Sequence, residues 1–175
     1  FHHSFFLASK TAKDGSTYKN LSFPMHIPGQ HDKCVGLEER GYPRKDGSAR
    51  KGMATGTNAS EGLWMASPKN TALQDARIVL VFESAYDAMA FYQLQMRKES
   101  GLDQRGRQDL KAGVYVSTGG NPSYGQIQGL LKAAPQATFH LGFDKDVAGK
   151  QFVANFEDIA SKQSPVAPGN VPAEM

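Results

Sequence analysis

Two aspartates stand one residue apart directly after an apolar stretch, in the segment HLGFDKDVAGK. If the chain is extended there, the side chains of Asp144 and Asp146 point to the same side, because alternate residues of a strand share a face. Their bases then lie roughly 7 Å apart, so both carboxylates can reach one cation. Mg²⁺ prefers hard oxygen ligands and commonly keeps substrate phosphates among its remaining ligands. The pair therefore predicts a metal site suited to phosphoryl or nucleotidyl transfer.

A third carboxylate, Glu83, ends a second apolar stretch, RIVLVFE. In an open parallel sheet the carboxyl ends of the strands share one edge, and binding sites form there. We therefore expect Glu83, Asp144 and Asp146 to converge, and we expect at least one carboxyl pKa to rise when no cation is present. Asp87 lies one helical turn after Glu83, so it either supports the metal or pairs with Ser84 as a helix cap.

The aspartate pair also fits two other interpretations. Carboxylates are favoured at helix starts, so Asp144 and Asp146 could serve only to cap the helix that follows. FDKDV further matches the first motif of haloacid-dehalogenase-type phosphatases, with Asp144 as nucleophile and Asp146 as acid and base. Only 29 residues follow Asp146, too few for the remaining strands and catalytic groups of that class. We therefore do not expect a phosphatase of this class. A role of Asp144 and Asp146 as helix caps remains an alternative.

Small and basic residues supply candidate contacts to nucleotide or nucleic-acid phosphates. The segment STGG could offer backbone N–H groups in front of a helix, although a tight turn that needs glycine explains it equally. The segment ERGYPRKDGSARKG is rich in cations, and a lysine follows the aspartate pair. A second basic run, MRKESGLDQRGRQDLK, has the pattern of a solvated loop. The candidates are Gly119, Gly120, Arg40, Arg50, Lys51 and Lys150.

Hydrophobic periodicity predicts the elements that would position these residues. Residues 16–27 and 33–42 alternate apolar and polar side chains around the turn PGQHD, which favours antiparallel strands. From residue 77 onward, expected strands at 77–83, 113–118 and 137–144 alternate with expected helices at 84–98, 123–134 and 147–162. Ser123 and Gln126 form a capping-box pattern. This alternation predicts a parallel sheet with right-handed crossovers.

Composition limits the class of protein. The chain has 175 residues, a net charge of +3 and one cysteine, Cys34, which rules out an internal disulfide. The apolar run IVLVF is too short to span a bilayer, and no leader is evident, so we expect a cytoplasmic protein without a membrane partner. We divide the chain into a β-rich part with the basic ribbon (1–70), an α/β domain (71–162) and a Pro-rich tail or linker (163–175).

The ordered acidic residues resemble the Toprim domain shared by bacterial primases, topoisomerases and some nucleases. Its hallmarks are a glutamate that ends one strand and Asp-x-Asp that ends a later one, matched here by VFESAYDAM and GFDKDVAGK. LSFPMHIPGQHDKCVGLEERGY is similar to the stretch that opens the polymerase domain of bacterial-type DNA primases, which places Arg40 at a family arginine. ARKGMATGTNASEGLW is similar to the following segment, with Lys51 near a family basic residue. The resemblance covers residues 21–156 and is closest to Toprim-like primase and mobilisation proteins of plasmids and transposable elements.

The resemblance implies an α/β fold: a Toprim-like, mostly parallel sheet flanked by helices, preceded by a small antiparallel β subdomain. It implies primase-type nucleotidyl transfer with Mg²⁺ (or Mn²⁺) held by Glu83, Asp144 and Asp146. The implied partners are single-stranded DNA template and nucleotide triphosphates, with helicase or relaxase domains in a larger replication or mobilisation protein. Two alternatives stay open: DNA cleavage by the same carboxylates, and a nucleic-acid-binding module without catalysis.

Overall fold

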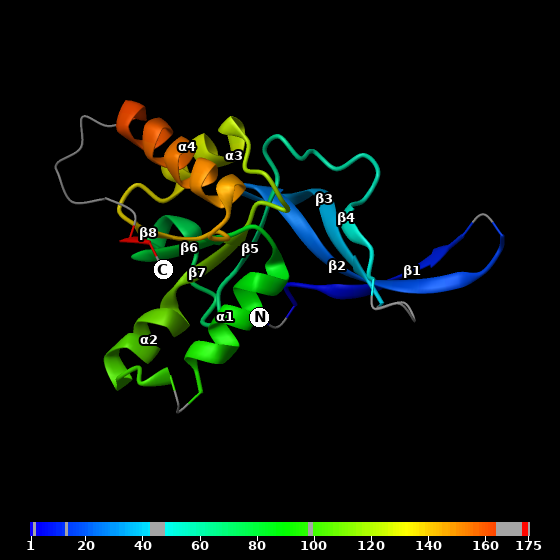
Figure 1. Cartoon of the computed structure of the whole chain (residues 1–175), viewed down its shortest axis with the longest axis horizontal. Coiled ribbons are helices and arrows are strands. Elements are labelled where there is room, and N and C mark those ends of the chain that lie inside the picture. The colour runs from blue at the N-terminus through cyan, green and yellow to red at the C-terminus, as the bar shows by residue number, and fades with distance from the viewer. Residues whose placement is uncertain (2, 13, 43–47, 98–99, 164–172, 175) are drawn as a thin grey trace.

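The computed structural model describes residues 1, 3–12, 14–42, 48–97, 100–163 and 173–174. Within these residues the strands form one nine-stranded sheet, with helices covering both faces of its parallel half (Figure 1). The strands are β1 (Phe6–Thr11), β2 (Thr17–Ile27), β3 (Gln30–Gly41), β4 (Lys51–Met53), β5 (Leu63–Ala66), β6 (Ile78–Phe82), β7 (Val114–Ser117), β8 (Thr138–Gly142) and β9 (Ala173–Glu174). The helices are η1 (Leu73–Asp75), α1 (Ala85–Gln95), α2 (Gln104–Ala112), α3 (Tyr124–Ala133) and α4 (Val147–Gln163).

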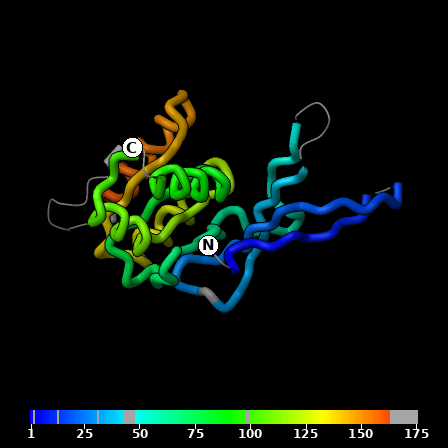
Figure 2. Tube along the Cα trace, turned by 90° about the horizontal axis from the view of Figure 1, so that it is seen from below, coloured from blue at the N-terminus to red at the C-terminus, as the bar shows by residue number. Residues whose placement is uncertain are grey.

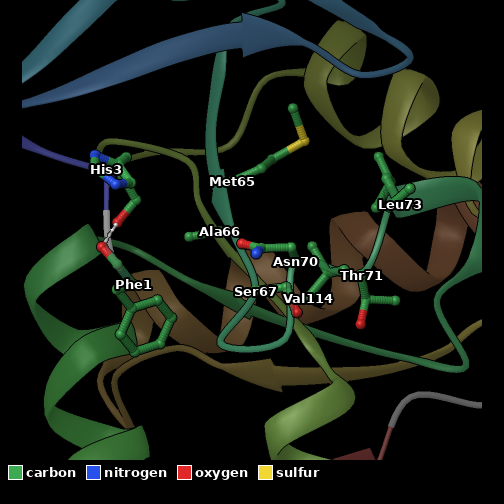
Figure 3. A pocket seen from close by; sticks show the side chains of 11 residues that line it. Phe1, His3, Met65, Ala66, Ser67, Asn70, Thr71, Leu73 and Val114 are labelled. Atoms are coloured by element: carbon green, nitrogen blue, oxygen red, sulfur yellow. Dashed lines mark hydrogen bonds between the residues drawn. The ribbon is translucent and has the colours of Figure 1, made fainter.

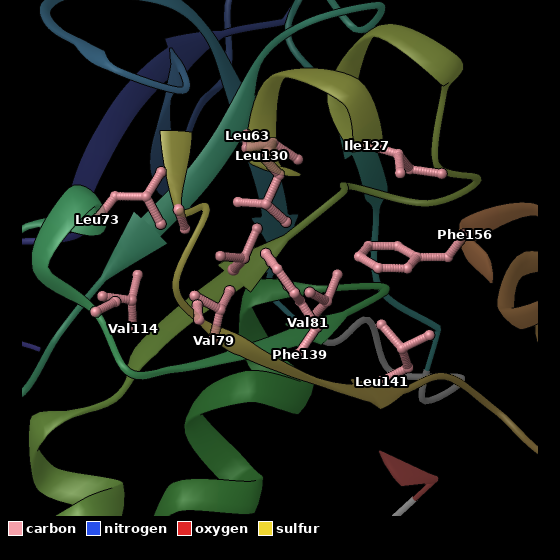
Figure 4. Close-up of a cluster of buried hydrophobic side chains, with 14 of the residues drawn as sticks. Leu63, Leu73, Val79, Val81, Val114, Ile127, Leu130, Phe139, Leu141 and Phe156 are labelled. Atoms are coloured by element: carbon pink, nitrogen blue, oxygen red, sulfur yellow. The ribbon is translucent and has the colours of Figure 1, made fainter. Parts of the chain in front are cut away.

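The parallel half of the sheet has the order β7-β6-β8 and is buried on both faces. Along β6 the side chains alternate between two cores, as a strand covered on both sides requires. Val79 and Val81 pack with residues of α3 and α4, including Ile127 and Phe156 (Figure 4). Leu80 and Phe82 pack toward α1 on the opposite face, in the core that contains Ala85 and Ala88.

β5 joins this parallel half to the antiparallel strands. It pairs with β2 on one side and with β7 on the other, both in antiparallel sense. Trp64 on β5 is 1% exposed, and its indole Nε1 donates to the carbonyl of Ser4 at 2.7 Å. The hydrogen-bonded sheet therefore runs without a break across the boundary that we drew between residues 70 and 71.

The strands β1 and β2 form a long hairpin that projects away from the helices (Figures 1 and 2). β1 pairs with β2 from Phe6↔Ser22 to Thr11↔Thr17, while β3 and β4 continue the sheet from the other side of β2. Pro24 lies between the part of β2 that pairs with β1 and the part that pairs with β5. A residue without a backbone N–H is tolerated where the strand changes its neighbour in this way.

Most predicted elements are confirmed within a few residues of their expected ends. The alternation of strands and helices after residue 77 is present, and Ser123 and Gln126 form the expected reciprocal capping box. β1, β4, β5, β9, η1 and α2 were not predicted. The basic run that we expected as a solvated loop contains α2, and within it Arg107 donates to the carbonyls of Met96, Arg97 and Leu102. That arginine therefore joins the end of α1 to the start of α2.

Two further expectations concern the tail and membranes. Ala173 and Glu174 of the expected tail form β9, which pairs with β8, whereas residues 164–172 and 175 lie outside the described residues. In the part of the chain that the structure describes, no helix has the length and apolar character needed to cross a bilayer.

Candidate functional site: an acidic edge beside a basic ribbon

The carboxyl ends of β6, β7 and β8 meet at one edge of the sheet, because these three strands are parallel neighbours. Glu83 directly follows β6, residues 118–120 follow β7, and Asp144 comes two residues after β8. We call this place the acidic edge and define it by Glu83, Asp144 and Asp146.

Glu83 is half-buried, and its carboxylate lies beside the chain that leaves β8. Its Oε1 accepts a hydrogen bond from the backbone N–H of Asp144 at 3.3 Å. Burial raises the pKa of Glu83, and the negative charges of Asp144, Asp146 and Asp87 raise it further, against the lowering effect of that hydrogen bond. The expected rise of a carboxyl pKa is therefore present, with burial as its largest cause.

Asp144 and Asp146 are exposed, and Asp146 has a structural role. Its Oδ1 accepts from the backbone N–H of Gly149 at 2.8 Å, which satisfies a donor at the first turn of α4. Gly149 is required there, because a Cβ atom would overlap the carbonyl oxygen of Asp144. The cap that we considered as an alternative for the aspartate pair is thus formed by Asp146.

The three carboxylates are neighbours but do not form a ready-made ligand cluster. Within the described residues, no group of three His, Cys, Asp or Glu side chains is arranged to hold a metal ion. The donors fit Mg²⁺ in type, since they are hard oxygen ligands. They also lie at the same edge of the sheet, where Glu83 Oε1 accepts from the backbone N–H of Asp144 at 3.3 Å. Convergence on one ion would require the exposed aspartate side chains to turn toward Glu83.

Asp87 acts as part of the cap of α1. Ser84 is the N-cap residue, and its Oγ accepts from the backbone N–H of Asp87 at 3.2 Å. The same hydroxyl lies 2.5 Å from Asp87 Oδ2, to which it donates. The capping interpretation of Asp87 is therefore confirmed, while its charge still acts on Glu83.

The glycine loop after β7 packs closely against the rest of the site. The N–H of Gly119 donates to Ser117 Oγ at 3.1 Å, and the N–H of Gly120 donates to the carbonyl of Glu83 at 2.9 Å. A phosphate could accept from these two N–H groups only if they gave up their present acceptors, Ser117 Oγ and the Glu83 carbonyl. Both glycines have positive φ, and a Cβ atom on Gly119 would overlap the Met53 side chain of β4. Their positive φ accounts for both glycines here, since a Cβ atom on Gly120 would meet open space.

The predicted basic residues occupy two places. Arg40 on β3 is the cross-strand partner of Lys51 on β4, so both side chains share one face of the strand pair β3–β4, which we call the basic ribbon. Arg40 is half-buried and Lys51 is exposed. Arg50 is exposed next to them, and its carbonyl accepts from the N–H of Gly41 at 2.9 Å. Lys150 is exposed in the first turn of α4, close in sequence to Asp146.

Glu38 connects this ribbon to the acidic edge through its hydrogen bonds, and our sequence analysis did not identify it as a candidate residue. Its carboxylate accepts from Ser117 Oγ at 2.7 Å and from the backbone N–H of Ala85 at 3.3 Å, and it pairs with Arg40 at 3.2 Å. Burial raises the pKa of Glu38, whereas Ser117 and Arg40 act to lower it. Consecutive glutamates within a predicted strand were the available signal, because one of two neighbours must face inward.

A pocket among the described residues lies elsewhere. It has a volume of about 350 Å³ and is lined by residues that include Phe1, Met65, Leu73 and Val114 (Figure 3). Val114 begins β7, so the cavity is at the amino ends of the parallel strands, opposite the acidic edge.

Comparison with known proteins yields structural neighbours and a family, although no curated protein matches. The fold resembles the primase fragment of the bacteriophage T7 primase-helicase protein, with a TM-score of 0.52, 16% identity, and coverage of 97% of this chain and 56% of that one. It also resembles the zinc-binding and RNA polymerase domains of the Aquifex aeolicus primase, with a TM-score of 0.51, 12% identity, and coverage of 87% and 34%. The chain thus spans about half of the first neighbour and a third of the second.

A family model described as Toprim-like matches residues 80–172, which is 93 of the 175 residues. The matched segment runs from within β6 through α4 and contains all three residues of the acidic edge. Together with the mixed sheet and the primase neighbours, this confirms the expected Toprim fold of the primase type. The chain belongs to the Toprim-like family.

Proposed function

We propose that this chain carries out metal-dependent nucleotidyl transfer on nucleic acid, as in primer synthesis by primases. The observation that carries the proposal is the Glu83 carboxylate lying beside the backbone of Asp144, at the edge where two further carboxylates are exposed. Membership of the Toprim-like family and the likeness to two primase fragments support it.

Glu83, Asp144 and Asp146 would hold Mg²⁺ or Mn²⁺, with Asp87 adding negative charge from the cap of α1. When bound, such an ion polarises phosphate oxygens and offsets the charge that develops on the leaving pyrophosphate. The raised pKa of Glu83 makes its ionised form costly in the metal-free protein, and a divalent cation would remove that cost.

The basic ribbon would bind the polyanionic substrates. Arg40, Arg50 and Lys51 would contact phosphates of the nucleotide triphosphate or of the single-stranded DNA template, because cations that follow the backbone supply most of the affinity for nucleic acid. Lys150 would add a further cation from the first turn of α4. Gly119 and Gly120 would contribute by keeping the loop after β7 compact.

In this proposal the chain acts in the cytoplasm within a larger replication or plasmid-mobilisation protein, next to helicase or relaxase domains. The T7 neighbour is described as part of a primase-helicase protein, which is the kind of arrangement that we propose.

Primer synthesis by the full-length protein tests the proposal. We expect Glu83→Gln, Asp144→Asn and Asp146→Asn each to lower Mg²⁺-dependent extension on labelled single-stranded DNA at least about 100-fold, because even residues that only orient metal ligands contribute 10–100-fold. Asparagine caps a helix about as well as aspartate, so Asp146→Asn preserves the start of α4.

Asp109→Asn is the matched control, because Asp109 is exposed on α2, which leads into the amino end of β7. Its extension should equal that of the wild type. Shortening of the labelled strand in place of extension would assign the acidic edge to cleavage. If the protein neither extends nor shortens the labelled strand and does not bind Mn²⁺, the chain is a non-catalytic module and the proposal is overturned.

A further inference from the structure

β3 carries two buried glutamates in succession, and each faces a different part of the molecule. Glu38 is 1% exposed and Glu39 is 0% exposed. Neighbouring residues of a strand point to opposite faces. Glu39 meets Lys10 of β1 at 2.5 Å and Asn20 of β2 at 3.4 Å, so it holds the hairpin to the sheet. Glu38 points to the face that carries Arg40 and Lys51.

The carboxylate of Glu38 connects three elements at the acidic edge. Both of its oxygens lie 3.3 Å from the backbone N–H of Ala85, two residues after Glu83 at the start of α1. Oε2 accepts from Ser117 Oγ at the end of β7, at 2.7 Å. Oε1 lies 3.2 Å from an Arg40 guanidinium nitrogen on its own strand. These contacts hold the carboxylate from several directions.

We propose that Glu38 is a positioning residue that fixes the Arg40 guanidinium beside the acidic edge, where it receives the triphosphate of an incoming nucleotide. This inference rests on the proposed function. A guanidinium has five N–H donors in a rigid fork, and its contact with Glu38 occupies one of its nitrogens. The side chain of Arg40 is 18% exposed, so it is not sealed off from solvent.

A merely structural role for Glu38 predicts something different. Buried ion pairs contribute little net stability, since desolvation of the charges offsets their attraction. If Glu38 only neutralised Arg40, its negative charge would repel a triphosphate, and removing that charge would strengthen nucleotide binding. A positioning role predicts the opposite sign, because an unfixed guanidinium must be ordered when the phosphate arrives.

Nucleotide and metal binding by the whole chain separate these roles. We expect Glu38→Gln to weaken binding of a labelled nucleotide triphosphate in the presence of Mn²⁺ about 10-fold, in the range found for residues that orient a ligand. Binding of Mn²⁺ alone, measured by electron paramagnetic resonance, should change less than about 2-fold, because Glu83, Asp144 and Asp146 are intact. Glu39→Gln is the matched control, and it should change neither quantity.

Glu38→Asp guards against loss of folding in the glutamine variant. It keeps the charge but shortens the side chain by one methylene, so it cannot reach Ala85, Ser117 and Arg40 together. We expect it to weaken nucleotide binding in the same direction, with a circular dichroism spectrum like that of the wild type.

A double-mutant cycle with Arg40→Gln decides whether Glu38 acts through Arg40. Residues that act as one unit are not additive, so Glu38→Gln should cause no further loss in the Arg40→Gln background. Three results would overturn this inference alone. The losses of nucleotide binding could be additive in the double mutant, they could be equal in Glu38→Gln and Glu39→Gln, or Glu38→Gln could bind nucleotide more tightly than the wild type. A wild-type chain that binds neither Mn²⁺ nor nucleotide would overturn the proposed function and this inference together.

Discussion

Glu83 would meet opposite demands from folding and from the metal binding that we propose. Burial and the neighbouring charges of Asp144, Asp146 and Asp87 disfavour its ionised form. A metal ion, by contrast, requires the carboxylate. Carboxyl groups with raised pKa values are common where an enzyme binds cations or moves protons.

The raised pKa makes the stability of the metal-free protein depend on pH in a defined direction. The folded state holds the Glu83 proton more tightly than the unfolded state, so stability falls as pH rises from the ordinary pKa of 4.5 to the raised value. Above that value the loss is complete. Glu83→Gln removes this loss of stability, because glutamine does not ionise. We expect the variant's melting temperature at pH 7.5, without divalent metal, to exceed that of the wild type by about 1–2 °C.

Below pH 4 the wild type and Glu83→Gln should have the same melting temperature, because Glu83 is then protonated and resembles glutamine. Added Mg²⁺ should raise the melting temperature of the wild type and not that of Glu83→Gln. Glu157→Gln on the exposed face of α4 is the control and should follow the wild type at every pH. A Glu83→Gln variant that is less stable at pH 7.5 would contradict the assigned direction.

Local sequence predicted Glu83, Asp144 and Asp146 because each follows an apolar strand at a fixed spacing. It could not predict the contacts of Glu38, because its partners Ala85 and Ser117 lie 47 and 79 residues away along the chain. The direction of the Asp146 side chain was also open, because a metal ligand and a helix cap require the same residue type at the same position.

The start of α4 depends on a close contact between two parts of one turn. The chain at Asp144 passes directly over Gly149, which is buried. We expect Gly149→Ala to displace this turn and to lower the free energy of unfolding by about 1–3 kcal/mol, which is typical of overpacking. Urea unfolding followed by circular dichroism measures the change.

Gly129→Ala in α3 is the helical control. A Cβ atom there would lie 3.4 Å from the side chain of Pro28, an ordinary contact distance. Alanine favours a helix interior over glycine by up to about 1 kcal/mol, so this variant should equal or exceed the wild type in stability. Equal losses in both variants would mean that the contact with Asp144 is not what requires glycine at position 149.

The elements that sequence patterns identified have a buried stripe or a buried run, although the short buried strand β5 was missed as well. α2 has no buried residue among its nine positions, so no apolar periodicity could reveal it. Its Asp103 cap and the three carbonyl contacts of Arg107 hold it in place. β1 was missed for the same reason, because its side chains are exposed or half-buried along its whole length.

The nine strands of the described residues form one continuous sheet, which includes the projecting hairpin. Trp64 on β5 lies where the antiparallel and parallel halves meet, and it is the protein's one tryptophan. We expect Trp64 fluorescence and far-ultraviolet circular dichroism to report the same urea midpoint, since a shared sheet favours a single cooperative transition. Two separated midpoints would instead support the division at residue 70.

The order of the strands was beyond the reach of sequence patterns. Alternating strands and helices indicated the parallel half, but nothing local showed that β5 pairs with both β2 and β7. Pairings between strands distant in sequence depend on which edges meet after the chain has collapsed.

The central position of β5 limits how this protein can be divided. A fragment that began at residue 71 would present β7 as an uncovered strand, with the polar backbone groups that now pair with residues 64–66 exposed. Bare edges of this kind recruit other chains and promote aggregation. The same cut would remove Glu38, so the Ala85 N–H and the Ser117 hydroxyl would lose their acceptor. A fragment that keeps this fold therefore has to retain β3 and β5.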